Sequence, residues 1–240
     1  GDLLLAALER FPNHLVLASD LFRVAEAGGD AELMLQALEL EAEARPEDRR
    51  ALALARASVV LREQRERPSA LELLRAAARA DPHNFSLWRN LEELAMATSR
   101  HEIAAEACVG QLRAAADGGD DGALAEVYYR LGKLALFRLD RPHEGLGAMR
   151  RALKLSPGHP LTLEDTGRFL NAGQMWAQQL EFVKLQIAAA GDMGLTSDEL
   201  AQCHLRAGQL MEEHLGEYEG ARKAYADAAS GAPNFRPPRD

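Results

Sequence analysis

The sequence predicts an all-α protein built from consecutive helical hairpins, on the basis of its composition, its proline spacing and a repeated side-chain pattern. Among 240 residues, Ala occurs 44 times and Leu 39 times, and both residues are strong helix formers. Val, Ile and Thr, which favour strands, occur only 7, 2 and 4 times. The chain is long enough to bury a core without a disulfide or a metal. An α/β enzyme fold is therefore not expected.

Prolines mark a regular period along the chain. They follow Ala-rich helical stretches with separations of 34, 36, 75 and 76 residues, and the last two separations are each about twice 38; these prolines are Pro12, Pro46, Pro82, Pro157 and Pro233. Because proline does not continue a helix, each of them indicates the end of one. The spacing predicts a structural repeat of two helices.

A trio of small, large and small residues precedes several of these prolines at one spacing. Ala70, Leu74 and Ala77 stand before Pro82 with steps of 4, 3 and 5 residues. The same steps join two further trios to their prolines, namely Gly145, Met149 and Ala152, and Ala221, Tyr225 and Ala228. Steps of 4 and 3 place the three side chains on one helix face, where small residues allow a neighbouring helix to come close.

The helix before each trio carries a matching glycine. Gly132 and Gly208 each stand 13 residues ahead of the first trio member, Gly145 and Ala221. The segments YYRLGKLALFRLDRPHEGLGAMRRALKLSPGHP and LRAGQLMEEHLGEYEGARKAYADAASGAPNF resemble the tetratricopeptide repeat (TPR) family, with degenerate bacterial-type repeats. That resemblance implies a right-handed α-α superhelix, a TPR-like solenoid of about six helical hairpins plus a leading half-repeat.

Three repeats depart from the family pattern. The repeat around Pro46 has Met34, Leu38 and Glu41 at the trio positions, and the repeat that opens at Trp88 has Ala104, Cys108 and Gln111. In the stretch 161–190, Gly167 fits the glycine position, but the second helix lacks the trio. The register of these repeats is therefore less defined than their helical character.

The expected elements follow from these patterns and from the helix breakers between them. Thr196 or Ser197 is expected to cap a helix that has Glu199 in its first turn. One helical-repeat domain is expected over 1–234, followed by a flexible tail at 235–240. The expected helices are a half-repeat at 2–11 and the pairs 13–27 with 30–45, 48–64 with 68–80, 85–98 with 101–116, 121–139 with 142–155, 159–172 with 174–190, and 197–215 with 217–230.

The opening half-repeat predicts that the chain is part of a longer repeat array, because a lone second helix buries only one face. The first residue is Gly1 rather than Met, which indicates a processed form or a piece of a longer protein. The chain is expected to be cytoplasmic, unless a signal or anchor preceded Gly1.

Charge and hydropathy exclude other function classes. The chain has 28 basic and 37 acidic residues, a formal charge of −9. Nucleic-acid binding needs a basic stripe, and the basic residues here are scattered. No apolar run reaches the roughly 18 to 20 residues that cross a bilayer. Neither a nucleic-acid partner nor membrane insertion is expected.

No pattern of catalytic or metal-ligating residues is found in the sequence. The seven histidines are dispersed and lack metal-ligand spacing. Asp117, Asp120 and Asp121 do not continue into a calcium-loop pattern, and Cys108 and Cys203 are expected to be free thiols. We therefore predict a non-enzymatic protein without a metal or other cofactor.

The remaining candidate for function is the surface. In the TPR family the first helices line a concave groove, and this resemblance implies a partner-binding role for ten residues. Tyr129 is expected there because Tyr128 falls at the packing position of the motif. Such a groove suits a peptide or protein held by polar contacts around an apolar anchor. The groove residues are Arg89, Glu93, Glu126, Tyr129, Lys133, Glu164, Arg168, Asn171, Gln202 and Gln209.

The predicted function is a protein-protein interaction or scaffold module. One alternative is a self-assembling spacer that forms homo-oligomers through uncapped solenoid ends, and another is an accessory region of a larger multidomain enzyme or signalling protein. An RNA-binding helical repeat is disfavoured by the negative charge.

Overall fold

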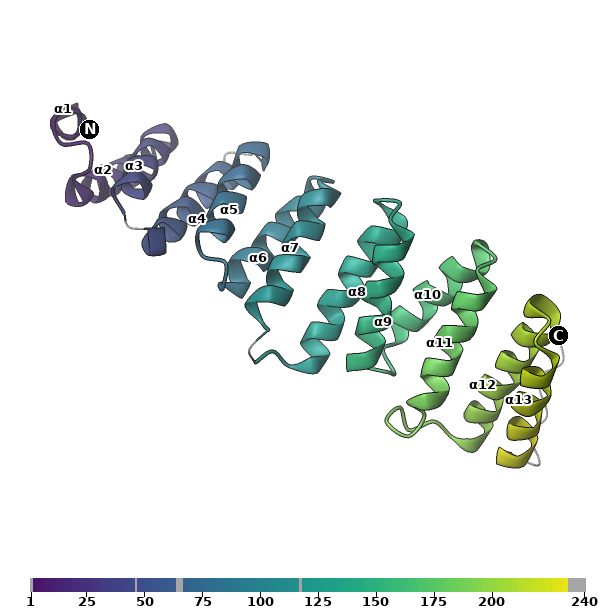
Figure 1. The fold of residues 1–240 in the computed structure, drawn as a ribbon. Helices are drawn as coiled ribbons and strands as arrows, with labels where there is room; N and C mark the ends of the chain where they lie inside the picture. The colour runs from purple at the N-terminus through teal and green to yellow at the C-terminus, as the bar shows by residue number, and fades with distance from the viewer. Residues whose placement is uncertain (1, 46, 64–66, 117, 233–240) are drawn as a thin grey trace. The chain divides into compact units, whose positions relative to one another are not determined.

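A computed structural model describes residues 2–45, 47–63, 67–116 and 118–232. Within these residues the secondary structure consists of helices, and no strand occurs among them. The expected tail at 235–240 lies outside the described residues. Figure 1 shows the helices, which are α1 (Asp2–Arg10), α2 (Leu15–Gly28), α3 (Ala31–Ala44), α4 (Glu47–Glu63), α5 (Arg67–Ala80), α6 (Phe85–Ala97), α7 (His101–Ala114), α8 (Asp121–Phe137), α9 (Pro142–Leu155), α10 (Pro160–Ala172), α11 (Trp176–Ala188), α12 (Ser197–Gln209), the π-helix η1 (Leu210–Leu215) and α13 (Tyr218–Gly231).

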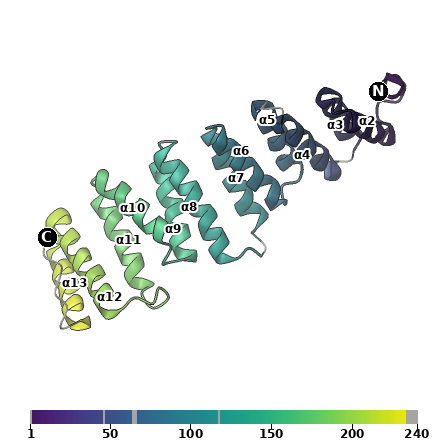
Figure 2. The same cartoon turned by 180° about the vertical axis from the view of Figure 1, so that it is seen from behind.

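The chain divides into two compact units, Gly1–Gly119 and Asp120–Asp240. Within the first unit α2 pairs with α3, α4 with α5, and α6 with α7; within the second, α8 pairs with α9 and α12 with α13. The two opposite views in Figures 1 and 2 both show the partners of these hairpins side by side. The predicted all-α fold of helical hairpins is confirmed. The expectation of one domain over 1–234 stays a prediction.

Side chains at the helix starts explain where the elements begin. Asp30, Asn84 and Asp120 each accept a hydrogen bond from the backbone N–H three residues ahead, as N-caps do. Thr196 caps α12 and exchanges hydrogen bonds with Glu199 in a capping box, which confirms the cap expected there.

The turns inside the hairpins share one backbone feature. A residue with positive φ stands two positions before the second helix begins, at Gly29, Ser99, Asp140, Gln174 and Gly216. Glycine adopts this conformation freely, whereas Ser, Asp and Gln adopt it at a cost. The turn between α4 and α5 contains residues 64–66, which lie outside the described residues.

Close helix contacts at the glycines confirm the packing role that the trios predict. A Cβ atom on Gly132 would lie 3.0 Å from Met149 and 3.1 Å from the carbonyl oxygen of Gly145. A Cβ atom on Gly208 would lie 2.3 Å from the ring of Tyr225. In these two hairpins the large member of the trio thus fills the space above the glycine of the preceding helix.

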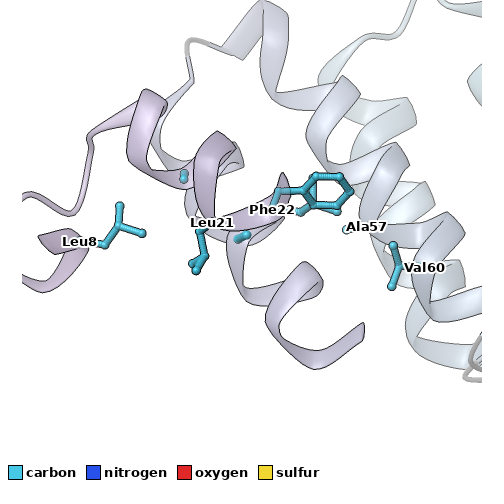
Figure 3. Packing of buried hydrophobic residues seen from close by; sticks show 8 residues of the cluster. Leu8, Leu21, Phe22, Ala57 and Val60 are labelled. Carbon is cyan, nitrogen blue, oxygen red and sulfur yellow. The ribbon is translucent and has the colours of Figure 1, made fainter. Parts of the chain in front are cut away.

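In the first unit, apolar side chains from the four consecutive helices α1 to α4 form one core cluster. Leu8 of α1, Leu21 and Phe22 of α2, and Ala57 and Val60 of α4 belong to it. Figure 3 shows the Phe22 ring extending toward Ala57. Burial of this apolar surface holds the consecutive hairpins of the unit together.

One departure from the trio is explained by a buried ion pair in this unit. Glu41, at the third trio position of α3, is almost fully buried. It accepts hydrogen bonds from Arg45 and, at 3.4 Å, from Arg56. A charge inside a hairpin needs such partners.

Two details of the second unit differ from the sequence expectations. Residues 210–215 form a π-helix rather than the end of a continuous α-helix, and its His214 ring stacks on Trp176 with the centroids 3.9 Å apart. In the α10–α11 hairpin, Gln179 takes the place that Gly145 has in the α8–α9 hairpin. The glycine position, 13 residues earlier, is therefore Thr166 rather than Gly167. A Cβ atom on Gly167 would have no neighbour within 4 Å.

Candidate functional site

The first helices of the second unit carry most of the predicted groove residues. Helix α8 contacts α10, and a hydrogen bond from Arg206 to Asn171 joins α12 to α10. We refer to the polar side chains of α8, α10 and α12 together as the first-helix face.

The centre of this face is a hydrogen-bonded triad between α8 and α10. The hydroxyl of Tyr129 donates to Oδ2 of Asp165 at 2.9 Å and accepts from Nζ of Lys133 at 2.9 Å. Lys133 Nζ also lies 3.1 Å from Asp165 Oδ2. Tyr129 is only 4% exposed and Asp165 is buried as well, whereas the Lys133 side chain is 53% exposed.

The triad shifts the pKa values of all three groups. Burial raises the pKa of Asp165, but the hydrogen bonds from Lys133 and Tyr129 outweigh it, so that its pKa lies below the ordinary value. Hydrogen bonds to Tyr129 and Asp165 raise the pKa of Lys133. Burial, with the Asp165 carboxylate, raises the pKa of Tyr129. At neutral pH the site therefore holds a carboxylate, an ammonium and a neutral phenol.

Beside the triad, His159 connects the start of α10 to α8. Its Nδ1 accepts from the backbone N–H of Thr162 at 3.3 Å and caps the helix. Its Nε2 therefore carries the hydrogen and donates to Oε2 of Glu126 at 3.1 Å. The imidazole also lies against Tyr129, with ring centroids 5.2 Å apart.

The exposed charges along α10 are paired with one another. Arg168 lies 2.5 Å from Glu164 and 3.5 Å from Asp165, and its side chain is 64% exposed. One turn further, Oδ1 of Asn171 accepts from Nε2 of Gln179 at 2.8 Å and from Arg206 at 3.4 Å. Charges of both signs thus alternate along the face.

The contacts described above include six of the ten predicted groove residues, and the other four take no part in them. The six are Glu126, Tyr129, Lys133, Glu164, Arg168 and Asn171. Gln202 and Gln209 are exposed on α12. Arg89 and Glu93 lie on α6 in the first unit, where they pair with each other at 3.4 Å.

Tyr129 differs from its expected role as an open groove anchor. Its side chain is buried, and its hydroxyl is occupied by Asp165 and Lys133. Tyr129 belongs to the core cluster of its hairpin, and Tyr128 is a partly buried side chain packed against that same cluster. Tyr129 therefore positions Lys133 and Asp165 rather than offering its own ring to a ligand.

Four important polar residues were absent from the sequence-based set: Asp165, His159, Arg206 and Gln179. His159 carries a local signal, because it precedes a helix at the cap position just as His14 does before α2. The other three depend on partners from other helices, and hydropathy along one helix does not identify such partners.

The described residues contain neither a cluster of metal ligands nor a helix suited to cross a membrane. Among the described residues, no group of three or more His, Cys, Asp and Glu side chains could hold a metal ion. Cys108 is buried and Cys203 is partly buried, and neither forms a disulfide with a described residue. No described helix combines the length and the apolar character that crossing a membrane requires.

Comparisons with known proteins give similarity in solved structures alone. No family model matches the chain, and no curated protein matches its sequence. A MamA structure is 17% identical with a TM-score of 0.43, covering 76% of this chain and 92% of MamA. YrrB, described as a TPR protein with an unusual peptide-binding site, is 19% identical with a TM-score of 0.41, covering 77% of this chain and 87% of YrrB. PilF from Pseudomonas aeruginosa is 17% identical with a TM-score of 0.41, covering 92% of both chains.

The fold class follows from the geometry of the chain itself. Its helices form consecutive hairpins, and the large residues of two trios sit over the glycines of the preceding helices. With the sequence pattern that resembles the TPR motif, these contacts make the chain a TPR-like helical-repeat protein.

Proposed function

We propose that the chain is a non-enzymatic interaction module that binds an extended peptide or protein segment along the first-helix face of α8, α10 and α12. The observation that carries this proposal is the continuous series of polar side chains that joins three successive first helices. Such a series matches the repeating polar groups of an extended peptide.

The charge pattern indicates the kind of segment. Among the exposed cations of the face, Lys133 and Arg168 are each already paired with an acidic side chain, whereas Arg206 donates to the amide oxygen of Asn171. A ligand of one sign would have to displace these pairs. A segment of mixed charge gains contacts without leaving a charge unpaired, so that it is the better complement.

The buried part of the site favours binding over catalysis. Asp165 and Tyr129 are held by each other and by Lys133 within the protein, so neither is free to transfer a proton to a substrate. Their effect is to fix the positions of Lys133 and the α10 backbone, which lowers the entropy cost of binding.

A paired retention experiment tests the proposal. The whole chain is immobilised as bait for a lysate of the source organism, beside an Arg168→Glu variant and an Arg222→Glu control. Arg222 is matched because it is 81% exposed, is paired with Glu219 at i,i+3, and lies on the second helix α13. Circular dichroism checks that all three baits are equally helical.

We expect the Arg168→Glu bait to retain at least about tenfold less of a protein that the unchanged bait retains, because reversing the charge repels the complementary group on the partner. Arg222→Glu should retain it fully. Equal retention by all three baits would contradict binding on the first-helix face, and loss with Arg222→Glu alone would move the site to the second helices.

A further inference from the structure

The α10–α11 hairpin contains a hollow of about 170 Å³ that is partly open to solvent. A volume of this size holds a benzene-sized group in other proteins. Apolar side chains form part of its wall, and polar ones stand among them. The lining residues are Leu163, Thr166, Gly167, Leu170, Asn171, Gln179, Phe182, Val183, Gln186 and Arg206.

The hollow arises because α10 and α11 have different residues at the positions where α8 and α9 pack closely. In the α8–α9 hairpin, Gly132 lies against Gly145 and Met149. Counted from the left-handed turn residues Asp140 and Gln174, the same three positions in α10–α11 hold Thr166, Gln179 and Val183. Two larger polar residues hold the helices apart, and Val183 is too short to fill the space as Met149 does. Accordingly, α10 and α11 contact each other less than α8 and α9 do.

Two of these residues carry buried polar atoms without a protein partner. Thr166 is 2% exposed and Gln179 is 4% exposed. Among the described residues, Oγ1 of Thr166 and Oε1 of Gln179 make no hydrogen bond. An unsatisfied buried polar atom is costly, and both residues line the same hollow.

Neighbouring hydrogen bonds determine which way the Gln179 amide is turned. The Arg206 guanidinium can only donate, so the Asn171 atom that it contacts at 3.4 Å is the oxygen. The Gln179 atom 2.8 Å from this oxygen must then be Nε2. Oε1 of Gln179 is therefore the atom left over, and it needs a donor.

We propose that this hollow binds the primary carboxamide of an Asn or Gln side chain. The inference rests on the proposed function, since the side chain would belong to a peptide bound on the first-helix face. Asn171 and Arg206 belong to that face and also line the hollow. The carboxamide NH₂ donates to Oε1 of Gln179, and its oxygen accepts from the Thr166 hydroxyl. The methylene groups pack against Leu170 and Phe182.

Other side-chain chemistries satisfy the hollow less well. A carboxylate is attracted by Arg206, but it has no hydrogen to give to Gln179 Oε1. An ammonium donates, but it loses its hydration among apolar walls beside the Arg206 cation. An aliphatic group fills the volume and leaves both oxygens unsatisfied. A carboxamide carries a donor and an acceptor side by side and serves both atoms.

Nuclear magnetic resonance titration of the whole chain provides the test. The probes are pentapeptides Ala-Ala-Xaa-Ala-Ala with Xaa as Gln, Glu or Leu, acetylated and closed by an N-methylamide so that no terminal carboxamide is present. Propionamide is the free-carboxamide probe. The readout is the side-chain amide signal of Gln179, assigned by its loss in Gln179→Leu.

We expect the Gln peptide to shift this signal saturably, with the Glu and Leu peptides at least about tenfold weaker. Propionamide should shift the same signal more weakly, because it lacks the peptide contacts. Thr166→Val keeps the shape and removes the hydroxyl. It should fold with equal or higher stability and abolish the preference for Gln over Leu.

Other results would overturn the inference. Stronger binding of the Glu peptide would make the hollow an anion site, and stronger binding of the Leu peptide an apolar one. Propionamide binding as tightly as the Gln peptide would make the ligand a free small molecule, and no shift with any probe would leave no ligand site. If Arg168→Glu loses the partner while the Gln peptide does not bind, only this inference is wrong. If the Gln peptide binds while all three baits retain the partner equally, the hollow is a carboxamide site but the partner does not bind along the first-helix face.

Discussion

Polar side chains inside this helical protein are stabilised by partners on other helices. Gln111 of α7 is fully buried and donates to Glu92 of α6 at 2.6 Å. Asp165 of α10 is held by Tyr129 and Lys133 of α8. Each bond joins two helices, so these residues fix how the helices align as well as contributing to stability.

The Asp165 carboxylate makes the stability of the chain depend on pH at the acidic end. Its pKa in the folded chain lies below the ordinary value of 3.8, so the unfolded chain takes up this proton at a higher pH. The contribution is complete above about pH 4 and is lost as the pH falls through the folded-state pKa. We expect Asp165→Asn to flatten this acidic dependence and to lower stability at neutral pH by about 1 to 2 kcal/mol.

Urea unfolding between about pH 2 and pH 7, followed by circular dichroism, measures this effect. Glu219→Gln is the control, because Glu219 pairs with Arg222 on the surface of α13, where an ion pair contributes little. An unchanged acidic dependence in Asp165→Asn would show that the triad does not hold the carboxylate in solution.

The sequence identified exposed polar residues of the face better than buried ones. Arg168 and Asn171 were found because helical period and register suffice for an exposed position. Tyr129 was expected in the open groove, and Asp165 was missed. Tyr129 and Asp165 are buried because they contact each other between two helices, and they lie 36 residues apart in the sequence. No local pattern encodes that contact.

At the scale of single elements, the glycines of the first helices set how closely each hairpin packs. Gly208→Ala should lower the free energy of unfolding by about 1 to 2 kcal/mol, because its Cβ would lie 2.3 Å from the Tyr225 ring and overpacking outweighs the gain in helix propensity. Gly147→Ala in α9 meets no atom within 4 Å and should raise it by about 0.5 to 1 kcal/mol. Urea unfolding of both variants measures the two changes in the free energy of unfolding, and equal changes would contradict the packing role of Gly208.

The hairpin turns offer a second prediction. Gln174 has a φ of 52°, and such a conformation costs a residue with a side chain about 1 to 2 kcal/mol. Gln174→Gly should therefore raise the free energy of unfolding by about 0.5 to 1 kcal/mol, after the entropy cost of glycine. Gly216→Ala, at a φ of 68°, should lower it. Thermal unfolding measures both variants. A higher melting temperature for Gln174→Gly and a lower one for Gly216→Ala would agree with this reason, and shifts in the same direction would contradict it.

Element boundaries were predicted well because their signals are local. Prolines, N-cap residues and glycine turns act within a few residues of the chain, and the observed helix ends lie close to those expected. The π-helix at Leu210–Leu215 was not predicted, because its stacking partner Trp176 lies on α11. The position of Thr166 was also missed, because the adjacent Gly167 fits the glycine of the repeat and the second helix lacks the trio that would fix the register.

At the scale of the whole molecule, the chain divides into two compact units, 1–119 and 120–240. We expect fragments 1–119 and 120–240 to fold independently, since each keeps complete hairpins and Asp120 stays with the helix that it caps. Circular dichroism and thermal unfolding of each fragment check this. A fragment that is largely unfolded would instead support one cooperative domain over 1–234.

The turn residue with positive φ also bears on how such a chain can be recombined. From Asp140 to Gln174 is 34 residues, and each stands at the same distance before its second helix. A splice made at these two points would exchange a complete cassette without altering the backbone at the junction. Shuffled or duplicated cassettes would then give longer or shorter repeat proteins, in which the order of the cassettes determines the order of the side chains along the surface.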